Sequence, residues 1–286
     1  MSKIIWLASY PKSGNTWMRT FLTNYWRDAD EPVDINSLAG GPIASARGVF
    51  DDFVGVEASD LTPEEIERLR PYVYEQMAEN SEETLFLKVH DAFTYTPEGI
   101  PLLSKKATRG ALYLVRNPLD VAVSFAHHSN RPVGKMIPKM ADSTFAFVNN
   151  PNRLHNQLVQ KLLTWGEHAL SWVDEPDLNV LVVRYEDMKM KTEETFSQVV
   201  KFCGLDFDEE RLQKALRFSS FDVLQAQEKE HGFGEKMPTS ESFFRKGRTG
   251  SWREKLTEEQ AAQLIHDHRE VMQRFGYLTD DGDVVF

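Results

Sequence analysis

The hydrophobic positions of the chain form short continuous runs separated by segments with helical spacing. Uninterrupted apolar strands that alternate with helices are typical of a parallel sheet covered on both faces. Ligands bind beyond the carboxyl ends of such strands, so we expect the chemistry just after each run. The pattern predicts an α/β fold in a single domain, residues 1–286, with a central, mostly parallel sheet flanked by helices. Four runs have strand length: Ile4–Ala8, Thr84–Lys88, Ala111–Val115 and Asn179–Val183.

Capping residues and apolar spacing indicate where helices begin. Thr62 and Thr257 each stand three residues before a Glu or Gln, which is the capping-box pattern. Two segments, 28–59 and 228–251, are rich in turn-forming and polar residues, and we expect loops there. Helical spacing predicts helices over 17–26 and 153–173 and a largely helical stretch over 185–227.

Composition narrows the classes of partner. The 286 residues include 33 basic and 44 acidic side chains, for a net charge of −11. A nucleic-acid or anionic-membrane binder needs a positively charged face, so we expect neither partner. The single cysteine, Cys203, rules out an internal disulfide and disfavours a structural zinc site. No apolar run reaches the ~20 residues of a membrane-spanning helix, and we expect a soluble, cytoplasmic protein.

A polar loop, YPKSGNTW at residues 10–17, follows the first apolar run. Backbone N–H groups and the positive end of the next helix then point at one place, where an anion binds. Lys12 adds a charge, and Ser13 and Thr16 add hydroxyl donors. Gly14 lets the backbone approach a ligand closely. The loop is not a Walker A motif, since GxxxxGK[ST] occurs nowhere in the chain; the alternative is an ordinary strand-to-helix turn with a surface lysine.

Two further segments carry basic residues. Arg116 follows the third apolar run, and an Asn-Pro pair then opens a helix that carries Ser124. Arg116 would hold a second anion there, or form a structural pair with an acid such as Asp120. Residues 245–253 read RKGRTGSWR, with four basic residues. This segment is either a cationic lid over a polyanionic ligand or a solvated charge run.

These segments together resemble the motifs of the PAPS-dependent sulfotransferases, where PAPS is 3′-phosphoadenosine 5′-phosphosulfate. The family reads YPKSGTTW at the 5′-phosphosulfate loop, an Arg and a Ser at the 3′-phosphate, and RKGxxGxW near the end. The resemblance implies a P-loop-like nucleotide-binding architecture and sulfuryl transfer from PAPS to a hydroxyl or amine of a small-molecule acceptor, leaving 3′-phosphoadenosine 5′-phosphate (PAP). The nucleotide-binding residues that it implies are Lys12, Ser13, Gly14, Asn15, Thr16, Trp17, Arg116, Ser124, Tyr185, Ser220, Phe221, Arg245, Lys246 and Gly247.

Lys88 and His90 end the second strand, and the alternation of a strand puts them on one side. A neutral His90 is predicted to accept the proton of the acceptor hydroxyl as a general base. Lys12 and Lys88 would neutralise charge on the leaving phosphate, so no metal is expected. Asp91 either raises the pKa of His90 or points away, and the sequence leaves both open.

Two other functions compete with this prediction. A variant P-loop kinase would need Mg²⁺, and a non-catalytic nucleotide-binding module would have no use for Lys12, Lys88 and His90 together. Segments 35–53, 93–95 and 129–151 are candidate walls of an acceptor pocket, and their mix of Phe, Tyr, Met and Pro suits a partly apolar small molecule. Alternatively, His127, His128 and Arg131 would favour a polar or anionic acceptor. The sequence leaves the acceptor and the oligomeric state open.

Overall fold

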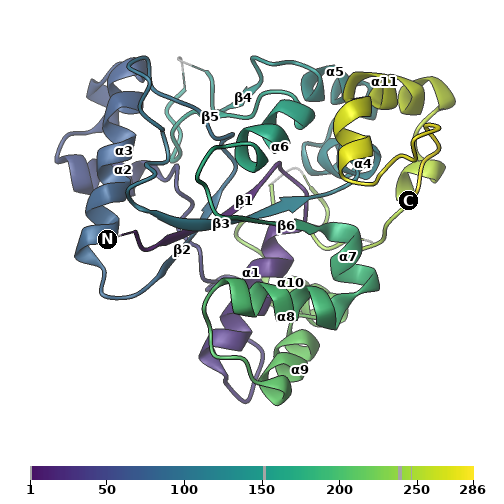
Figure 1. The fold of residues 1–286 in the computed structure, drawn as a ribbon, viewed down its shortest axis with the longest axis horizontal. Helices are drawn as coiled ribbons and strands as arrows, with labels where there is room; N and C mark the ends of the chain where they lie inside the picture. The colour runs from purple at the N-terminus through teal and green to yellow at the C-terminus, as the bar shows by residue number, and fades with distance from the viewer. Residues whose placement is uncertain (1, 151–152, 238–239, 246) are drawn as a thin grey trace. The chain divides into compact units, whose positions relative to one another are not determined.

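The computed structural model describes residues 2–150, 153–237, 240–245 and 247–286 (Figure 1). The chain forms two compact units, each made of three chain segments. The first unit contains Met1–Tyr10, Gly40–Tyr113 and Asp142–Val182. The second unit contains Pro11–Ala39, Leu114–Ala141 and Val183–Phe286. The prediction of one domain over residues 1–286 stays a prediction.

A central parallel sheet has the strand order β2-β1-β3-β6 and is flanked by helices, as the sequence predicted (Figure 1). In the parallel pair of β1 and β2, Ile4 lies opposite Leu85 and Ala8 lies opposite Val89. All of β1 is buried, which explains its uninterrupted apolar run. The four strands are β1 (Ile4–Ser9), β2 (Leu85–Val89), β3 (Thr108–Val115) and β6 (Val180–Arg184).

The first unit adds helices and a short antiparallel ribbon to this sheet. Helix α3 begins at the capping box of Thr62 and Glu65, as predicted. The apolar side of α3 packs on Phe50 and Leu158 through Val73. The further elements of this unit are α2 (Arg47–Val54), η1 (Ala58–Asp60), α3 (Pro63–Asn80), β4 (Ala146–Phe147), β5 (Gln160–Lys161) and α6 (Trp165–Val173).

Two predictions about this unit are wrong. The segment 28–59 is not a continuous loop, because α2 forms there and buries Phe50 in the cluster that it shares with α3. Such a short helix is stabilised by tertiary packing more than by its own sequence. The helix predicted over 153–173 begins only at Trp165, after the capping box of Thr164 and Glu167. The residues before it run extended, since Leu158 N–H donates to the backbone of Ser45 and β5 pairs with β4.

The second unit is mainly helical. On α1, the ring of Phe21 lies 4.3 Å from that of Phe196 on α8. Helix α10 runs on to His231, beyond the start of the loop predicted at 228. The elements of this unit are α1 (Asn15–Arg27), α4 (Pro118–His128), η2 (Val133–Lys135), α5 (Ile137–Met140), α7 (Tyr185–Met190), α8 (Thr192–Phe202), α9 (Glu209–Phe218), α10 (Phe221–His231), η3 (Ser251–Glu254) and α11 (Glu258–Arg274).

Helix α11 begins at the predicted capping box of Thr257 and Gln260. Helix α4 begins at the predicted Asn-Pro pair, where the Asn117 side chain accepts from Leu119 N–H at 3.0 Å. Within the described part of the chain, no helix combines the length and the apolar character needed to cross a membrane.

Candidate functional site

The loop before α1 belongs to the second unit and has the backbone of an anion-binding turn. Lys12 and Gly14 both have positive φ angles, 73° and 101°. Gly14 is the N-cap of α1 and provides no side chain, so backbone N–H groups of the first turn remain for a ligand. The Ser13 side chain is fully buried, and its hydroxyl has no hydrogen-bond partner among the described residues. A buried hydroxyl without a partner costs free energy, so this loop fits an anionic group that accepts from Ser13.

Tyr185 packs directly against this loop from the start of α7. A Cβ atom added at Gly14 would lie 2.8 Å from the Tyr185 ring, and the φ of Gly14 is one that side chains rarely adopt. Only glycine fits at position 14 for both reasons. The guanidinium of Arg116 lies 4.3 Å from the centroid of the same ring. Tyr185 thus links the loop to the end of β3.

Arg116 connects the loop before α1 with residues 245–253 near the end of the chain, which we call the basic segment. Its Nη1 donates to the carbonyl of Lys12 at 3.2 Å and its Nη2 to the carbonyl of Arg248 at 3.0 Å. Its Nε is buried without a partner among the described residues. Nη2 also lies 3.8 Å from Asp120 Oδ2, so the expected structural pair exists beside the two loop contacts. After the Ser13 hydroxyl, Arg116 Nε–H is thus the second buried donor without a partner among the described residues, and an anion would accept from it.

Burial lowers the pKa of His127, and the positive charges of Arg245 and Lys12 both lower it further. The Lys12 ammonium lies 3.9 Å from the centroid of the Phe243 ring. Lys12, Arg116 and Arg245 all belong to the second unit. Their predicted convergence on one nucleotide stays a prediction. Sequence reasoning missed Phe243, because nothing local marks an aromatic residue 231 positions from its cation.

Aromatic rings cluster beside the loop. Trp17 and Phe221 both pack against a cluster that contains Leu224. The Lys189 ammonium lies 4.7 Å from the Trp17 ring centroid and 5.8 Å from that of Phe221. Burial lowers the pKa of Lys189, and the charge of Arg116 adds to the effect. Lys189 was missed from the sequence, although its place one turn after Tyr185 on α7 is a usable signal.

The remaining predicted nucleotide residues also lie in the second unit. Asn15 and Thr16 are buried in the first turn of α1, and Ser220 is the N-cap of α10. Ser124 is half-buried on α4. A Cβ atom at Gly247 would lie 2.5 Å from the Phe221 ring, so this glycine too makes a close approach. Lys246 lies outside the described residues.

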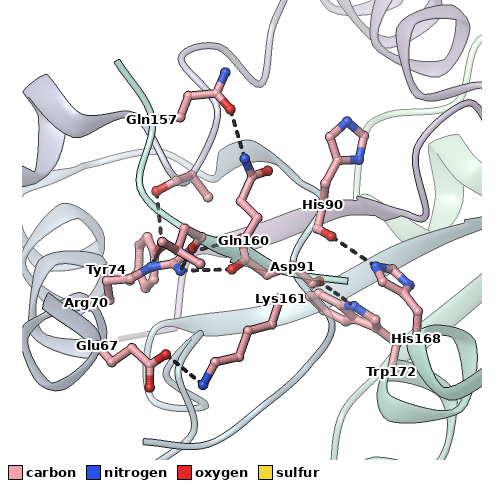
Figure 2. Close-up of polar contacts among 12 residues, drawn as sticks. Glu67, Arg70, Tyr74, His90, Asp91, Gln157, Gln160, Lys161, His168 and Trp172 are labelled. Atoms are coloured by element: carbon pink, nitrogen blue, oxygen red, sulfur yellow. Dashed lines mark hydrogen bonds and ion pairs between the residues drawn. The ribbon is translucent and has the colours of Figure 1, made fainter. Parts of the chain in front are cut away.

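His90 belongs to the first unit and follows β2. Figure 2 shows its side chain. Its Nδ1 lies 2.8 Å from the carbonyl oxygen of Ser9 and 3.3 Å from the Ser9 hydroxyl. A carbonyl oxygen only accepts, so Nδ1 must carry the proton. Nε2 is then the basic nitrogen of the neutral ring, which suits a general base.

The peptide of His90 and Asp91 is bound by side chains of α6 (Figure 2). His168 Nε2 donates to the His90 carbonyl at 3.1 Å, and Trp172 Nε1 donates to the Asp91 carbonyl at 3.1 Å. Tyr113 O–H donates to His168 Nδ1 at 2.8 Å. Burial lowers the pKa of His168 to about 4, so this histidine is neutral at pH 7. Its hydrogen bond to the His90 carbonyl gives it a structural role. The catalytic role predicted for His90 stays a prediction.

The Asp91 carboxylate turns to Arg70 and settles the question that the sequence left open. Arg70 donates to Oδ1 at 2.8 Å and to Oδ2 at 3.0 Å, and both side chains are buried (Figure 2). Arg70 also donates to Tyr74. Asp91 therefore points away from the His90 ring and is neutralised by Arg70. Lys88 is half-buried, whereas its neighbours Leu87 and Val89 are buried, as strand alternation requires.

Among the residues that the structure describes, no group of three or more His, Cys, Asp or Glu side chains is arranged to hold a metal ion.

Comparison with known proteins shows which family the chain resembles in sequence. The family model of the sulfotransferase domain matches residues 2–276. A sulfotransferase 6B1 of Danio rerio is 28% identical over 266 residues, which are 90% of this chain and 74% of that protein. An amine sulfotransferase of Oryctolagus cuniculus is 28% identical over 57% of this chain and 54% of its own length.

Solved structures share the fold. Mouse sulfotransferase SULT7A1, complexed with PAP, aligns with a TM-score of 0.61 at 21% identity, covering 96% of this chain and 86% of that one. A retinol dehydratase in complex with androsterone and PAP aligns with a TM-score of 0.60 at 20% identity, covering 99% of this chain and 82% of the other.

Proposed function

Because this chain belongs to the PAPS-dependent sulfotransferase family, we propose that it transfers the sulfuryl group of PAPS to a hydroxyl or amine of a small-molecule acceptor. The observation that carries the proposal is Arg116. It bonds to the carbonyls of both Lys12 and Arg248 and keeps a buried Nε without a partner among the described residues. Together with the unpartnered Ser13 hydroxyl in the loop before α1, Arg116 Nε suits a ligand with two separate anionic groups.

We assign the two ends of PAP to different residues of the second unit. The 5′ end would lie on the loop before α1, and the adenine between Trp17 and Phe221 near Tyr185 and Ser220. The 3′-phosphate would be held by Arg116, Ser124, Arg245, Lys246 and Gly247. The buried Ser13 hydroxyl and Arg116 Nε support this fit, because a phosphate oxygen would satisfy each. The residues proposed for the 5′ end are Lys12, Ser13, Gly14, Asn15 and Thr16.

The reaction needs a base and a neutralised leaving group. PAPS supplies an activated sulfuryl group whose bond to the 5′-phosphate breaks as the acceptor oxygen attacks sulfur. We propose that His90 Nε2 accepts the acceptor's proton, since Nδ1 already donates to Ser9. Lys12 and Lys88 would stabilise the charge that builds on the departing phosphate oxygen. The products are the sulfated acceptor and PAP.

We propose a partly apolar small molecule as acceptor. The aromatic side chains of Phe93 and Tyr95 follow β2 closely in sequence, with ring centroids 6.2 Å apart. A structure of similar fold carries androsterone, and another carries retinol. We expect an alcohol or phenol of that class here. The cytoplasmic location expected from the sequence stays a prediction.

Two binding measurements and one assay test the proposal. We expect PAP to bind at least about tenfold tighter than AMP by calorimetry, because AMP lacks the 3′-phosphate. With radiolabelled PAPS and a panel of phenols, alcohols and amines, label should reach at least one acceptor in the presence of a chelator. Equal affinities for PAP and AMP would remove the basis of the assignment, and transfer that requires ATP and Mg²⁺ would indicate a kinase instead.

A further inference from the structure

Asp120 binds a part of the chain far from its own helix. It lies in the first turn of α4 and is 1% exposed. Its Oδ2 accepts from Gly250 N–H at 2.7 Å, and its Oδ1 accepts from Ser251 O–H at 2.9 Å and from Trp252 N–H at 3.0 Å. Helix α4 does not need this carboxylate as a cap, because Asn117 already caps it. The carboxylate instead fixes the start of η3.

Glu228 likewise binds backbone N–H groups, here at the two residues just before the basic segment. It lies on α10, and its Oε1 accepts from Phe243 N–H at 2.6 Å while its Oε2 accepts from Phe244 N–H at 2.8 Å. Gln225, on the same helix, donates to the Phe244 carbonyl at 2.9 Å. Each carboxylate oxygen of Glu228 therefore accepts a hydrogen bond from one of two consecutive backbone N–H groups.

The two carboxylates thus flank the residues that we assign to the 3′-phosphate. Phe244 directly precedes Arg245, and Gly250 follows Arg248 by two residues. Arg116 holds the chain between them through the Arg248 carbonyl. The positive side chains of residues 245–253 repel one another and also repel Arg116. Charge-assisted bonds from two carboxylates oppose that repulsion and fix the backbone before a ligand arrives.

We propose that Asp120 and Glu228 are positioning residues for the 3′-phosphate of the nucleotide. Neither touches the phosphate; each holds one flank of the segment that supplies Arg245 and Gly247, and Asp120 also faces Arg116 at 3.8 Å. This inference rests on the proposed function. Its consequence is selective, because loss of either carboxylate weakens binding of the 3′-phosphate and leaves the 5′ end of the nucleotide bound as before.

The test compares PAP with AMP on Asp120→Asn and Glu228→Gln by calorimetry. Each variant keeps the shape of the side chain and loses its charge and one acceptor oxygen. We expect the preference for PAP over AMP to fall about tenfold in Asp120→Asn and about fivefold in Glu228→Gln, the effect of one or two charge-assisted hydrogen bonds. The affinity for AMP itself should change by no more than about twofold.

Two further variants separate positioning from general destabilisation. Ser251→Ala removes one donor to Asp120 and leaves the charge and the two backbone bonds, so it should fold even where Asp120→Asn does not; we expect about a threefold loss of preference. Asp208→Asn is the matched control, since Asp208 caps α9 by accepting from Arg211 N–H at 2.7 Å and so bonds within its own helix. It should keep the wild-type preference.

The outcomes distinguish the two proposals. If the wild-type protein prefers PAP and the Asp120, Glu228 and Ser251 variants keep that preference unchanged, the positioning role is wrong and the proposed function stands. If all variants, including Asp208→Asn, lose binding of PAP and AMP equally, the carboxylates only stabilise the fold and the inference is again wrong. If the wild-type protein does not distinguish PAP from AMP, the proposed function fails, and this inference fails with it.

Discussion

At the scale of single residues, the two histidines of the first unit that the structure brings together have different proton chemistry. His90 donates from Nδ1 to the Ser9 carbonyl, so its Nε2 is basic. His168 donates from Nε2 to the His90 carbonyl and accepts at Nδ1 from Tyr113. Hydrogen bonding occupies both nitrogens of His168, whereas the bond to the Ser9 carbonyl fixes only the tautomer of His90. Sequence order does not reveal this difference, which depends on what each ring contacts.

His90→Gln should abolish most turnover without loss of nucleotide binding. Glutamine fills similar space but has no basic nitrogen, so we expect the transfer rate to fall by about 10²–10⁴. The affinity for PAP should stay within about twofold, because the residues proposed for the nucleotide lie elsewhere in the chain. Single-turnover measurements with radiolabelled PAPS give the rate, and calorimetry gives the affinity. Turnover near the wild-type rate would show that another group is the base.

His168 should make the folded protein less stable in mild acid. Its pKa is about 4 in the folded protein and about 6.5 in the unfolded chain, because burial disfavours the charged ring. The unfolded state therefore binds more protons between these values. The stabilisation is complete above pH 6.5 and is lost as the pH falls towards 4, by about 1.4 kcal/mol for each pH unit.

Urea unfolding of the wild-type protein and of His168→Gln between pH 7.5 and 4.5 measures this effect. Other groups titrate in the same range, so the difference between the two proteins is the relevant quantity. We expect the wild-type protein to lose its advantage over the variant as the pH falls. A difference that does not change with pH would mean that folding leaves the pKa of His168 unchanged.

At the scale of elements, the pair of Arg70 on α3 and Asp91 after β2 is buried on both sides. Removing one charge leaves the other buried without a partner, so Arg70→Met should destabilise the protein by about 3–5 kcal/mol. The double variant Arg70→Met/Asp91→Leu removes both charges and should recover most of that loss. Thermal or urea unfolding of the two variants measures the difference. A double variant no more stable than the single one would show that the remaining polar partners, such as Tyr74, need the pair.

Helix boundaries test how far local sequence determines an element. The helices at Thr62 and Thr257 start where their capping boxes predicted. The capping box at Thr164 was overlooked, because Leu158 and Leu162 continued a helical spacing upstream of it. Those two leucines are buried from an extended segment instead, where pairing with distant residues outweighs periodicity. Helix α2 was missed for the opposite reason, since its stability comes from packing on α3.

The candidate site divides in the same way. Loop residues such as Lys12, Ser13 and Arg116 could be predicted because they follow apolar strands directly, and the fold brings strand ends together. The pairing of Asp120 with Arg116 was foreseen as one alternative, but its bond to Gly250 and the contact of Lys12 with Phe243 could not be predicted, because both span long stretches of the chain. The residue pattern of a short stretch of sequence carries no information about contacts between residues so far apart.

At the scale of the whole molecule, two of the five places where the chain passes between the units fall inside strands. The chain passes from the first unit to the second at Tyr113 and Leu114, within β3, and again at Val182 and Val183, within β6. Both strands belong to the sheet that also contains β1 and β2. A strand cannot lose half of its hydrogen bonds without weakening the rest, so we expect the units to unfold together, as one domain.

Calorimetric unfolding with and without PAP tests this expectation. The nucleotide is proposed to bind residues of the second unit, yet one cooperative transition should move as a whole. At a PAP concentration of 100 times its Kd, ligand binding stabilises the folded state by about 2.7 kcal/mol. For a protein of this size that shifts the midpoint by roughly 5–10 °C. Tryptophan fluorescence should report the same midpoint, since Trp6 lies in the first unit and Trp17 in the second. Two transitions, of which PAP moves only one, would instead mean that each unit is a domain and that interleaved segments alone do not couple them.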